Sequence, residues 1–357
     1  MLYSKDRVPV NTLTDDNYVS TENMLPQFGG IYKASNTPSN GSVIAYQKGD
    51  TLLSNIRPYL KKVWLANNNG GCSADVFVLK SINEKCNSDF LYYLVANDNF
   101  ISYVMSGAKG VKMPRGDKEQ IKKYLLSLPI KDEQHKIAEF LCKLDARIST
   151  QIRVIDKLES LIKGIYNVVL WRNYEQVSLS EMFIERNERT TTNNQYEVLS
   201  STAKGLYRQA DYFDKEVASA DNVGYKVLRL GDVVLSPQNL WLGNINYNNV
   251  FEVGIVSPSY KIFSINKQFN PYYVACFLKT HRTLYEYANA SEQGASVVRR
   301  NLDMDAFMAI TFPMPNKDVQ DSVSMKLQAI NKKLAIEKQI LDKLKEQKNY
   351  LLSQMFI

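Results

Sequence analysis

Two long amphipathic segments constrain the fold of this chain more than any other feature. The first, DEQHKIAEFLCKLDARISTQIRVIDKLESLIKGI, runs from Asp132 to Ile165, and the second, DVQDSVSMKLQAINKKLAIEKQILDKLKEQKNYL, runs from Asp318 to Leu351. Apolar residues recur in both at heptad spacing, which predicts long helices that pack against another helix. A helix of about 40 residues would be roughly 60 Å long, which is longer than a single globular core can use.

Two polar residues interrupt the apolar seams at equivalent places. Gln151 and Glu337 both lie near the midpoint of their helix. If the helices run antiparallel, these side chains meet and fix the register at some cost in stability. The alternative is that both face a partner or solvent. The heptad rows are Leu141, Ile148, Ile155, Ile162, Val169 with Leu144, Gln151, Leu158, Ile165, and Leu327, Leu334, Leu341, Lys348, Met355 with Ile330, Glu337, Leu344, Leu351.

The segments before the two helices also resemble each other. KGDTLLS (Lys48–Ser54) recurs 182 residues later as LGDVVLS (Leu230–Ser236), and SDFLYYL (Ser88–Leu94) aligns with PYYVACF (Pro271–Phe277). The matches keep the same order along the chain, so we interpret the sequence as an internal duplication.

Each copy reads as a globular part followed by a long helix. Short β-rich runs such as DVFVL alternate with Gly, Asn and Pro turns and with short helical patterns. The predicted fold is α+β: two strand-rich globular domains joined by two long antiparallel coiled-coil helices, with a pseudo-twofold internal repeat. The predicted boundaries are 1–131, 132–172, 173–316 and 317–357.

Motifs for catalysis are missing from the sequence. It contains no G-x-x-x-x-G-K-[ST] phosphate loop and no G-x-G-x-x-G turn, and its two histidines, His135 and His281, have no catalytic partners at suitable spacing. NPYY (Asn270–Tyr273) lacks the second proline of an amino-methyltransferase motif, so we interpret it as a helix start. The four scattered cysteines do not predict a metal site, and we expect no enzymatic activity, no cofactor in this chain and no metal.

The chain is expected to be cytoplasmic. It has no apolar run long enough for a membrane span and no apolar core of a signal peptide near its start. Its formal net charge is +7, but the sign varies: residues 1–131 carry 16 Lys+Arg against 11 Asp+Glu, whereas residues 173–316 carry 13 against 15. Any nucleic-acid contact must therefore come from local clusters.

The first pair of candidate DNA-contact segments follows the Gly-Asp turn in each copy. SNIRPYLKKVW (Ser54–Trp64) and SPQNLWLGNINY (Ser236–Tyr247) place polar and aromatic residues in an expected loop. Cations suit phosphate or guanine, and amides suit adenine or the backbone. The alternative is an ordinary solvated hairpin. The candidates are Arg57, Lys61, Lys62, Gln238 and Asn239.

A second pair of candidate segments lies further along each copy. GAKGVKMPRGD (Gly107–Asp117) and SEQGASVVRRNLD (Ser291–Asp303) combine glycines, which allow close approach to a backbone, with cations. The alternative is a flexible surface loop whose charges keep the protein soluble. The candidates are Lys109, Lys112, Arg115, Arg299 and Arg300.

These features together resemble the DNA-specificity (S) subunits of Type I restriction–modification enzymes, the HsdS family. The resemblance rests on LPIKDEQHKIAEFLCKLDARI, on KGDTLLSNIRPYL and LGDVVLS, and on the duplication. Its most specific feature is a proline followed by a glutamine at the entry to each long helix, where Gln134 and Gln320 lie.

The resemblance implies two target-recognition domains that each read half of a split, asymmetric DNA site, with the helices as spacer. It also implies partners: double-stranded DNA, two methyltransferase (M) subunits that bind S-adenosylmethionine and methylate adenine, and an ATP-driven restriction (R) subunit that can join them. S-adenosylmethionine and ATP are thus expected on partner subunits. No membrane partner is implied.

One departure concerns the start of the first copy. The second copy opens with YEQVSLSEMF (Tyr174–Phe183), whereas Met1 falls at or just after the corresponding point. The first copy thus lacks roughly ten residues, because the sequence starts late or is trimmed, or because the segment after Lys348 substitutes for them. Two other interpretations stay open: a coiled-coil scaffold whose globular ends bind proteins, and an inactive S subunit that serves as a cassette for domain shuffling.

Overall fold

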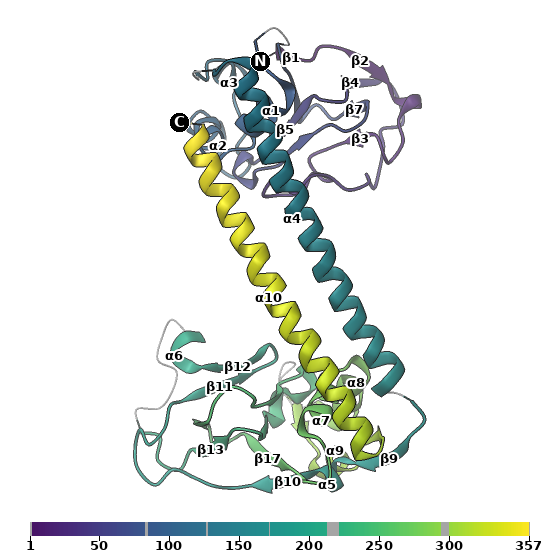
Figure 1. The fold of residues 1–357 in the computed structure, drawn as a ribbon, viewed down its shortest axis with the longest axis vertical. Helices are drawn as coiled ribbons and strands as arrows, with labels where there is room; N and C mark the ends of the chain where they lie inside the picture. The colour runs from purple at the N-terminus through teal and green to yellow at the C-terminus, as the bar shows by residue number, and fades with distance from the viewer. Residues whose placement is uncertain are drawn as a thin grey trace. The chain divides into compact units, whose positions relative to one another are not determined.

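The computed structural model describes residues 2–82, 85–125, 128–170, 172–212, 221–293 and 300–356. The chain divides into two compact units. The first unit comprises Met1–Val154 with Glu337–Ile357, and the second unit comprises Ile155–Ile336. Each unit mixes strands and helices, and each contains part of both long helices, so the predicted α+β class is confirmed (Figure 1).

The first unit contains two four-stranded sheets and three short helices. One sheet has the order β1 (Leu2–Tyr3), β8 (Val76–Lys80), β5 (Thr51–Ser54), β6 (Val63–Leu65). The other has the order β2 (Arg7–Pro9), β4 (Ser42–Tyr46), β7 (Gly70–Cys72), β3 (Tyr18–Val19). The helices are α1 (Ser88–Val95), α2 (Asp98–Ser106) and α3 (Lys118–Lys122), with 3₁₀ turns η1 (Val10–Thr12) and η2 (Pro58–Leu60).

The second unit is built around a sheet of the order β10 (Phe183–Arg186), β17 (Lys261–Ile265), β14 (Val233–Leu235), β15 (Ile245–Tyr247). Four strand pairs accompany it: β9 (Glu175–Ser178) with β20 (Thr311–Met314), β11 (Leu199–Thr202) with β12 (Gly205–Arg208), β13 (Lys226–Arg229) with β16 (Val253–Val256), and β18 (Ser291–Gln293) with β19 (Arg300–Leu302). Its short helices are α5 (Leu179–Met182), α6 (Gln209–Tyr212), α7 (Pro271–Phe277), α8 (His281–Asn289), α9 (Met304–Met308) and the 3₁₀ helix η4 (Pro237–Leu242).

The predicted duplication is visible in the strand register of the two units. Thr51 lies opposite Leu79 between β5 and β8, and Val233 lies opposite Phe263 between β14 and β17. The turn before each strand contains a glycine with positive φ, 91° at Gly49 and 89° at Gly231. Only glycine adopts that conformation without steric cost, which explains why KGD and LGD survive in both copies.

The glutamine at the entry of each long helix makes the same contacts in both units. Gln134 accepts a hydrogen bond from the backbone N–H of Asn87 (2.9 Å) and donates to the carbonyl of Pro129 (2.9 Å). Gln320 accepts from the N–H of Asn270 (2.8 Å) and donates to the carbonyl of Pro315 (2.8 Å). Both glutamines are buried, and both asparagines cap short helices. The glutamine thus joins a long helix to its globular part.

The long helices begin within one residue of the predicted starts. α4 extends from Lys131 to Ile165 and continues as a π-helical turn, η3 (Tyr166–Leu170), while α10 extends from Lys317 to Met355 (Figure 1). Every residue of the predicted heptad rows is buried or half-buried. Most positions between them are exposed, so the rows form the packing face of each helix.

In the first unit the two helices run antiparallel. Gln151 Nε2 donates to the backbone carbonyl of Glu337 (3.0 Å) and to its carboxylate. Six residues earlier in α4, Asp145 pairs with Lys348 Nζ at 2.6 Å. The partner of the earlier α4 residue is therefore the later α10 residue, as antiparallel packing requires. The two polar residues in the central part of the seams, Gln151 and Glu337, therefore contact each other.

The end of α10 packs into the core of the first unit. Leu352 and Phe356 are buried there, and the ring of Phe356 lies 5.1 Å from that of Phe90. Asn97 Nδ2 donates to the carbonyl of Leu352 at 3.0 Å. The C-terminal part of α10 is therefore an integral part of the first unit.

The two units differ at one strand. In the second unit β9 pairs with β20, and Phe312 is only 1% exposed. The equivalent segment of the first unit ends at Leu128 and Ile130, which are 46% and 67% exposed. Among the described residues of the first unit no strand corresponds to β9. Apolar side chains that the second unit buries are consequently exposed to solvent in the first.

Candidate nucleic-acid interface

The first unit brings its two predicted contact segments together. The backbone N–H of Arg57 donates to the carbonyl of Pro114 (2.8 Å), and Ile56 forms a bridge with Arg115. The N–H of Gly116 donates to the carbonyl of Asn55 (3.1 Å). Segments about 50 residues apart in the chain therefore form one composite surface.

The segment expected as a loop after β5 contains the 3₁₀ turn η2. Arg57 and Lys61 flank it with left-handed φ angles of 50° and 55°, a conformation that is costly for residues other than glycine. Pro58 is buried between them, whereas Arg57 and Tyr59 are exposed. The turn thus directs a cation and an aromatic ring outward.

The other two predicted cations of this segment contact the protein. Lys61 Nζ pairs with Asp98 at 2.8 Å. Lys62 Nζ donates to the carbonyl of Thr21 at 2.6 Å, and burial lowers the pKa of Lys62. Arg57 is therefore the predicted cation of this segment that is most accessible to a ligand.

The second segment of the first unit is a short hairpin. Lys109 and Arg115 exchange two backbone hydrogen bonds of 2.9 Å, and Gly110 adopts a φ of 96°. Lys109 Nζ pairs with Asp117 at 2.8 Å, and this hydrogen bond, together with two α3 amides, lowers the pKa of Asp117 to about 2. Arg115 pairs with Asp75 at 3.3 Å. These ion pairs hold the base of the hairpin.

The tip of this hairpin exposes apolar residues that the sequence reasoning missed. Val111 is 99% exposed and Met113 is 49% exposed, and Lys112 between them is also exposed. Apolar side chains at a cationic tip can contact a thymine methyl or enter a base step. The signal in the sequence is GVKM, in which two apolar residues flank a lysine directly after a glycine.

In the second unit the two predicted segments also meet. η4 contacts β19, and the guanidinium of Arg300 lies 4.3 Å from the ring centroid of Trp241. Arg300 Nη1 also donates to the carbonyl of Ala288 at 3.5 Å. Arg300 therefore packs the interface between the two segments. Arg299 lies outside the described residues.

The predicted amides of the second unit lie on η4. Gln238 is exposed and Asn239 is half-buried, and the carbonyl of Asn239 accepts a hydrogen bond from the N–H of Asn244 (3.2 Å). The unit therefore presents an amide where the first unit presents Arg57. Cations suit phosphates and guanine, whereas amides suit adenine, so the two surfaces offer different chemistry to DNA.

Comparison with known proteins connects this geometry to a family. Residues 14–160 match the family described as the Type I restriction modification DNA specificity domain. The Type I restriction enzyme EcoDI specificity subunit of Escherichia coli is 25% identical over 125 residues, which is 35% of this chain and 28% of that relative's length. Residues 14–160 are therefore similar to the Type I DNA-specificity family. The resemblance inferred from the sequence is confirmed, and the family is one of non-catalytic specificity subunits.

Two solved structures share the fold. The S subunit of the Type I restriction–modification system from M. genitalium has a TM-score of 0.58 at 15% identity, covering 99% of this chain and 96% of that one. A chain from a structure of the type I R-M system, titled for its complex assembly and conformational transition, has a TM-score of 0.54 at 17% identity, covering 94% and 90%. The chain therefore shares the fold of these two chains.

The described residues show no group of three His, Cys, Asp or Glu side chains that could hold a metal ion. In the same part of the chain, no helix is both long and apolar enough to cross a membrane.

Proposed function

We propose that this chain is the DNA-reading subunit of a Type I restriction–modification enzyme and that it reads a bipartite, asymmetric site. The observation that carries the proposal is the repeated composite surface. In each unit the two predicted contact segments touch, through Asn55, Ile56 and Arg57 in the first unit and through η4 in the second. Because the two surfaces carry different side chains, each half-site has a different sequence.

The proposal includes the partner subunits that would carry out methylation and cleavage. Two M subunits with S-adenosylmethionine methylate adenine in the half-sites, and R subunits with ATP cleave unmodified DNA. This chain supplies base readout, and its paired helices set the distance between the half-sites. The proposed compartment is the cytoplasm, where the host DNA is accessible.

Sequencing of methylated bases in the host genome, with and without the gene for this chain, tests the proposal. We expect one bipartite methylated motif to vanish on deletion. An unchanged set of methylated motifs would overturn the proposal. If the chain with its M subunits showed no salt-dependent affinity for DNA, a coiled-coil protein scaffold would be favoured instead.

A matched pair of variants tests the surface itself. In the full chain with M subunits, Arg57→Ala with Lys112→Ala removes two exposed cations of the first unit. We expect the slope of log affinity against log salt to fall by about 2 if each contacts one phosphate. Lys5→Ala with Lys48→Ala removes two exposed cations elsewhere in that unit and should leave the slope unchanged. Equal effects of the two pairs would remove the surface from the proposal.

A further inference from the structure

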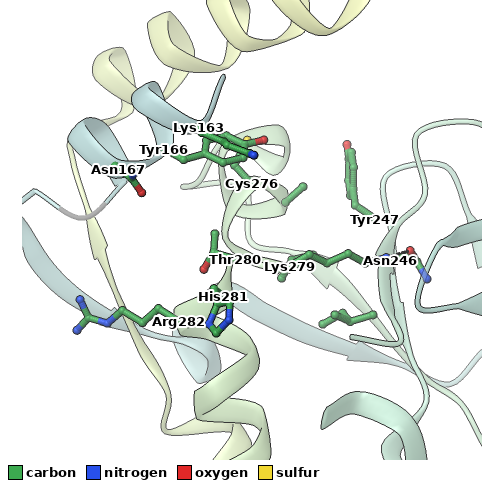
Figure 2. Close-up of a pocket in the computed structure, with 13 residues that line it drawn as sticks. Lys163, Tyr166, Asn167, Asn246, Tyr247, Cys276, Lys279, Thr280, His281 and Arg282 are labelled. Atoms are coloured by element: carbon green, nitrogen blue, oxygen red, sulfur yellow. Dashed lines mark hydrogen bonds between the residues drawn. The ribbon is translucent and has the colours of Figure 1, made fainter. Parts of the chain in front are cut away.

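The second unit contains a pocket that neither the sequence nor the family resemblance assigns. It has a volume of about 810 Å³ and lies between the end of α4, strand β15 and the start of α8 (Figure 2). The basic side chains that line it are Lys163, Lys279, His281 and Arg282, and its lining includes no acidic residue. Burial raises the pKa of Cys276 to about 12, so that thiol adds no negative charge.

The basic character of the pocket lining is not typical of the second globular part. Residues 173–316, which supply most of the lining, carry two more acidic than basic residues. Lys163, Lys279 and Arg282, together with His281, nevertheless line one concave site, and a site lined by basic side chains attracts anions.

The duplication provides an internal control for the role of these residues. α2 and α8 are nine residues long, and each begins after a side-chain cap, Asn97 in the first unit and Thr280 in the second. Aligned on these caps, Lys279 corresponds to Ala96, His281 to Asp98 and Arg282 to Asn99. The first unit forms the same helix without the cations, so the fold does not require them.

A hydrogen-bond network holds Lys279 at the pocket. Its Nζ donates to Asn246 Oδ1 (2.6 Å) and to the carbonyl of Ala203 (3.0 Å). Asn246 in turn donates to Ser201 Oγ (2.8 Å) and to the carbonyl of Thr202 (2.9 Å). Two of the three ammonium donors are used, and the third is available to a ligand. The cation is thus positioned before any ligand arrives.

We propose that this pocket is a phosphate-binding site and that the DNA backbone supplies the phosphate. The basic side chains of the lining complement the negative charge of a phosphate, and ammonium and guanidinium groups bind phosphate oxygens well. The pocket adjoins the proposed reading surface, because β15 follows η4 in the chain and α8 contacts η4. Phosphate contacts beside a base-reading segment fix the register of a protein on the duplex.

The remaining lining suits the rest of a nucleotide. The half-buried Tyr166 and Tyr247 offer aromatic surface, and Asn167 offers an amide (Figure 2). A free phosphate or mononucleotide presents the same chemistry as the backbone, so the experiment must separate the two sources. The DNA source rests on the proposed function, whereas phosphate binding as such does not.

The test uses the full chain with its M subunits. Lys163→Gln with Arg282→Gln removes two exposed cations of the pocket, and Lys204→Gln with Lys267→Gln removes two exposed cations elsewhere in the second unit. Fluorescence anisotropy with a non-specific duplex, from 50 to 300 mM salt, gives the salt slope. We expect the pocket pair to lower the slope by about 1 to 2 and the control pair to leave it unchanged.

A second arm titrates inorganic phosphate and adenosine monophosphate into the chain alone and follows the melting temperature. Protection that is lost in the pocket pair, with an unchanged DNA slope, would keep the phosphate site and overturn the DNA source. A pocket pair that matches the control in both arms would overturn the proposal. If Arg57→Ala with Lys112→Ala still weakens DNA binding, that failure leaves the proposed function intact.

Discussion

At the scale of single residues, the surroundings of each cation decide what it can bind. Arg57 and Lys112 are exposed, whereas Lys61 pairs with Asp98 and Arg300 lies on Trp241. The second group stabilises loops and the first is accessible to DNA. An exposed ion pair such as that of Lys61 contributes about 0 to 1 kcal/mol, so a phosphate could displace the carboxylate at small cost.

Replacing the two apolar residues of the hairpin tip with serine tests apolar contacts with bases separately from contacts made by charged groups. For Val111→Ser with Met113→Ser, we expect the affinity for the specific site to fall about tenfold, because apolar contacts with bases are lost. The salt slope should stay unchanged because no cation is removed. Both residues are exposed, so the free energy of unfolding should change by less than about 0.5 kcal/mol. Anisotropy titrations and urea unfolding give the three quantities.

Val223→Ser serves as the control, because this exposed valine of the second unit lies outside the hairpin and at least 13 residues from both predicted segments of its own unit. Unchanged affinity in the tip variant would show that the tip does not contact bases.

At the scale of elements, the duplication lets equivalent positions be compared within one chain. Phe312 of β20, which pairs with β9, is buried in the core of the second unit, whereas the equivalent Leu128 of the first unit is nearly half exposed. The connection from the globular part into the long helix therefore forms in both units, although a paired strand precedes the helix only in the second. The buried Gln134 and Gln320 make the same hydrogen bonds at this connection in both units, which explains why the connection has the same structure without the paired strand.

Alanine at these two positions should therefore have unequal effects. We expect Phe312→Ala to lower the free energy of unfolding of the second unit by about 3 to 5 kcal/mol, the usual cost of emptying a buried aromatic site. Leu128→Ala should lower that of the first unit by less than about 1 kcal/mol. Native-state hydrogen exchange with mass spectrometry reads each unit separately. A large loss of protection on Leu128→Ala would show that Leu128 is packed.

At the scale of the whole molecule, the central hypothesis is that the paired helices act as a spacer. The heptad rows are buried or half-buried along both helices, and Gln151 contacts Glu337 in the first unit, so the register of that antiparallel pair is specified. A register that is specified by side chains can be shortened only in matched steps, because a deletion in one helix alone brings unlike positions together.

Removing one heptad from both helices tests the spacer. Each helix becomes about 10 Å shorter, which corresponds to about three base pairs. We expect the methylated motif to keep both half-sites and to lose about three base pairs between them, as read by methylation sequencing of a host that carries the variant. A heptad deletion in α4 alone should instead reduce stability and methylation together. An unchanged spacer in the double deletion would contradict the hypothesis.

The sequence determined the long helices, their packing faces and the duplication. Heptad spacing, the Gly-Asp turns and the asparagine caps are local signals, since each rests on residues within a few positions of one another. Self-similarity then placed the two predicted contact segments in both copies. Even the contact between Gln151 and Glu337 followed from equal positions in two periodic helices.

Only the tertiary structure decided which cations are accessible and which side chains form the pocket. Lys62 contacts a carbonyl 41 positions away, and the pocket joins Lys163 to residues more than 80 positions later. The sequence alone does not encode such pairings by spacing, because they depend on how strands and helices pack. The exposure of Val111 also depends on the tertiary structure. Valine is usually buried, so the sequence alone favours a core position for it, whereas the structure places it at an exposed hairpin tip.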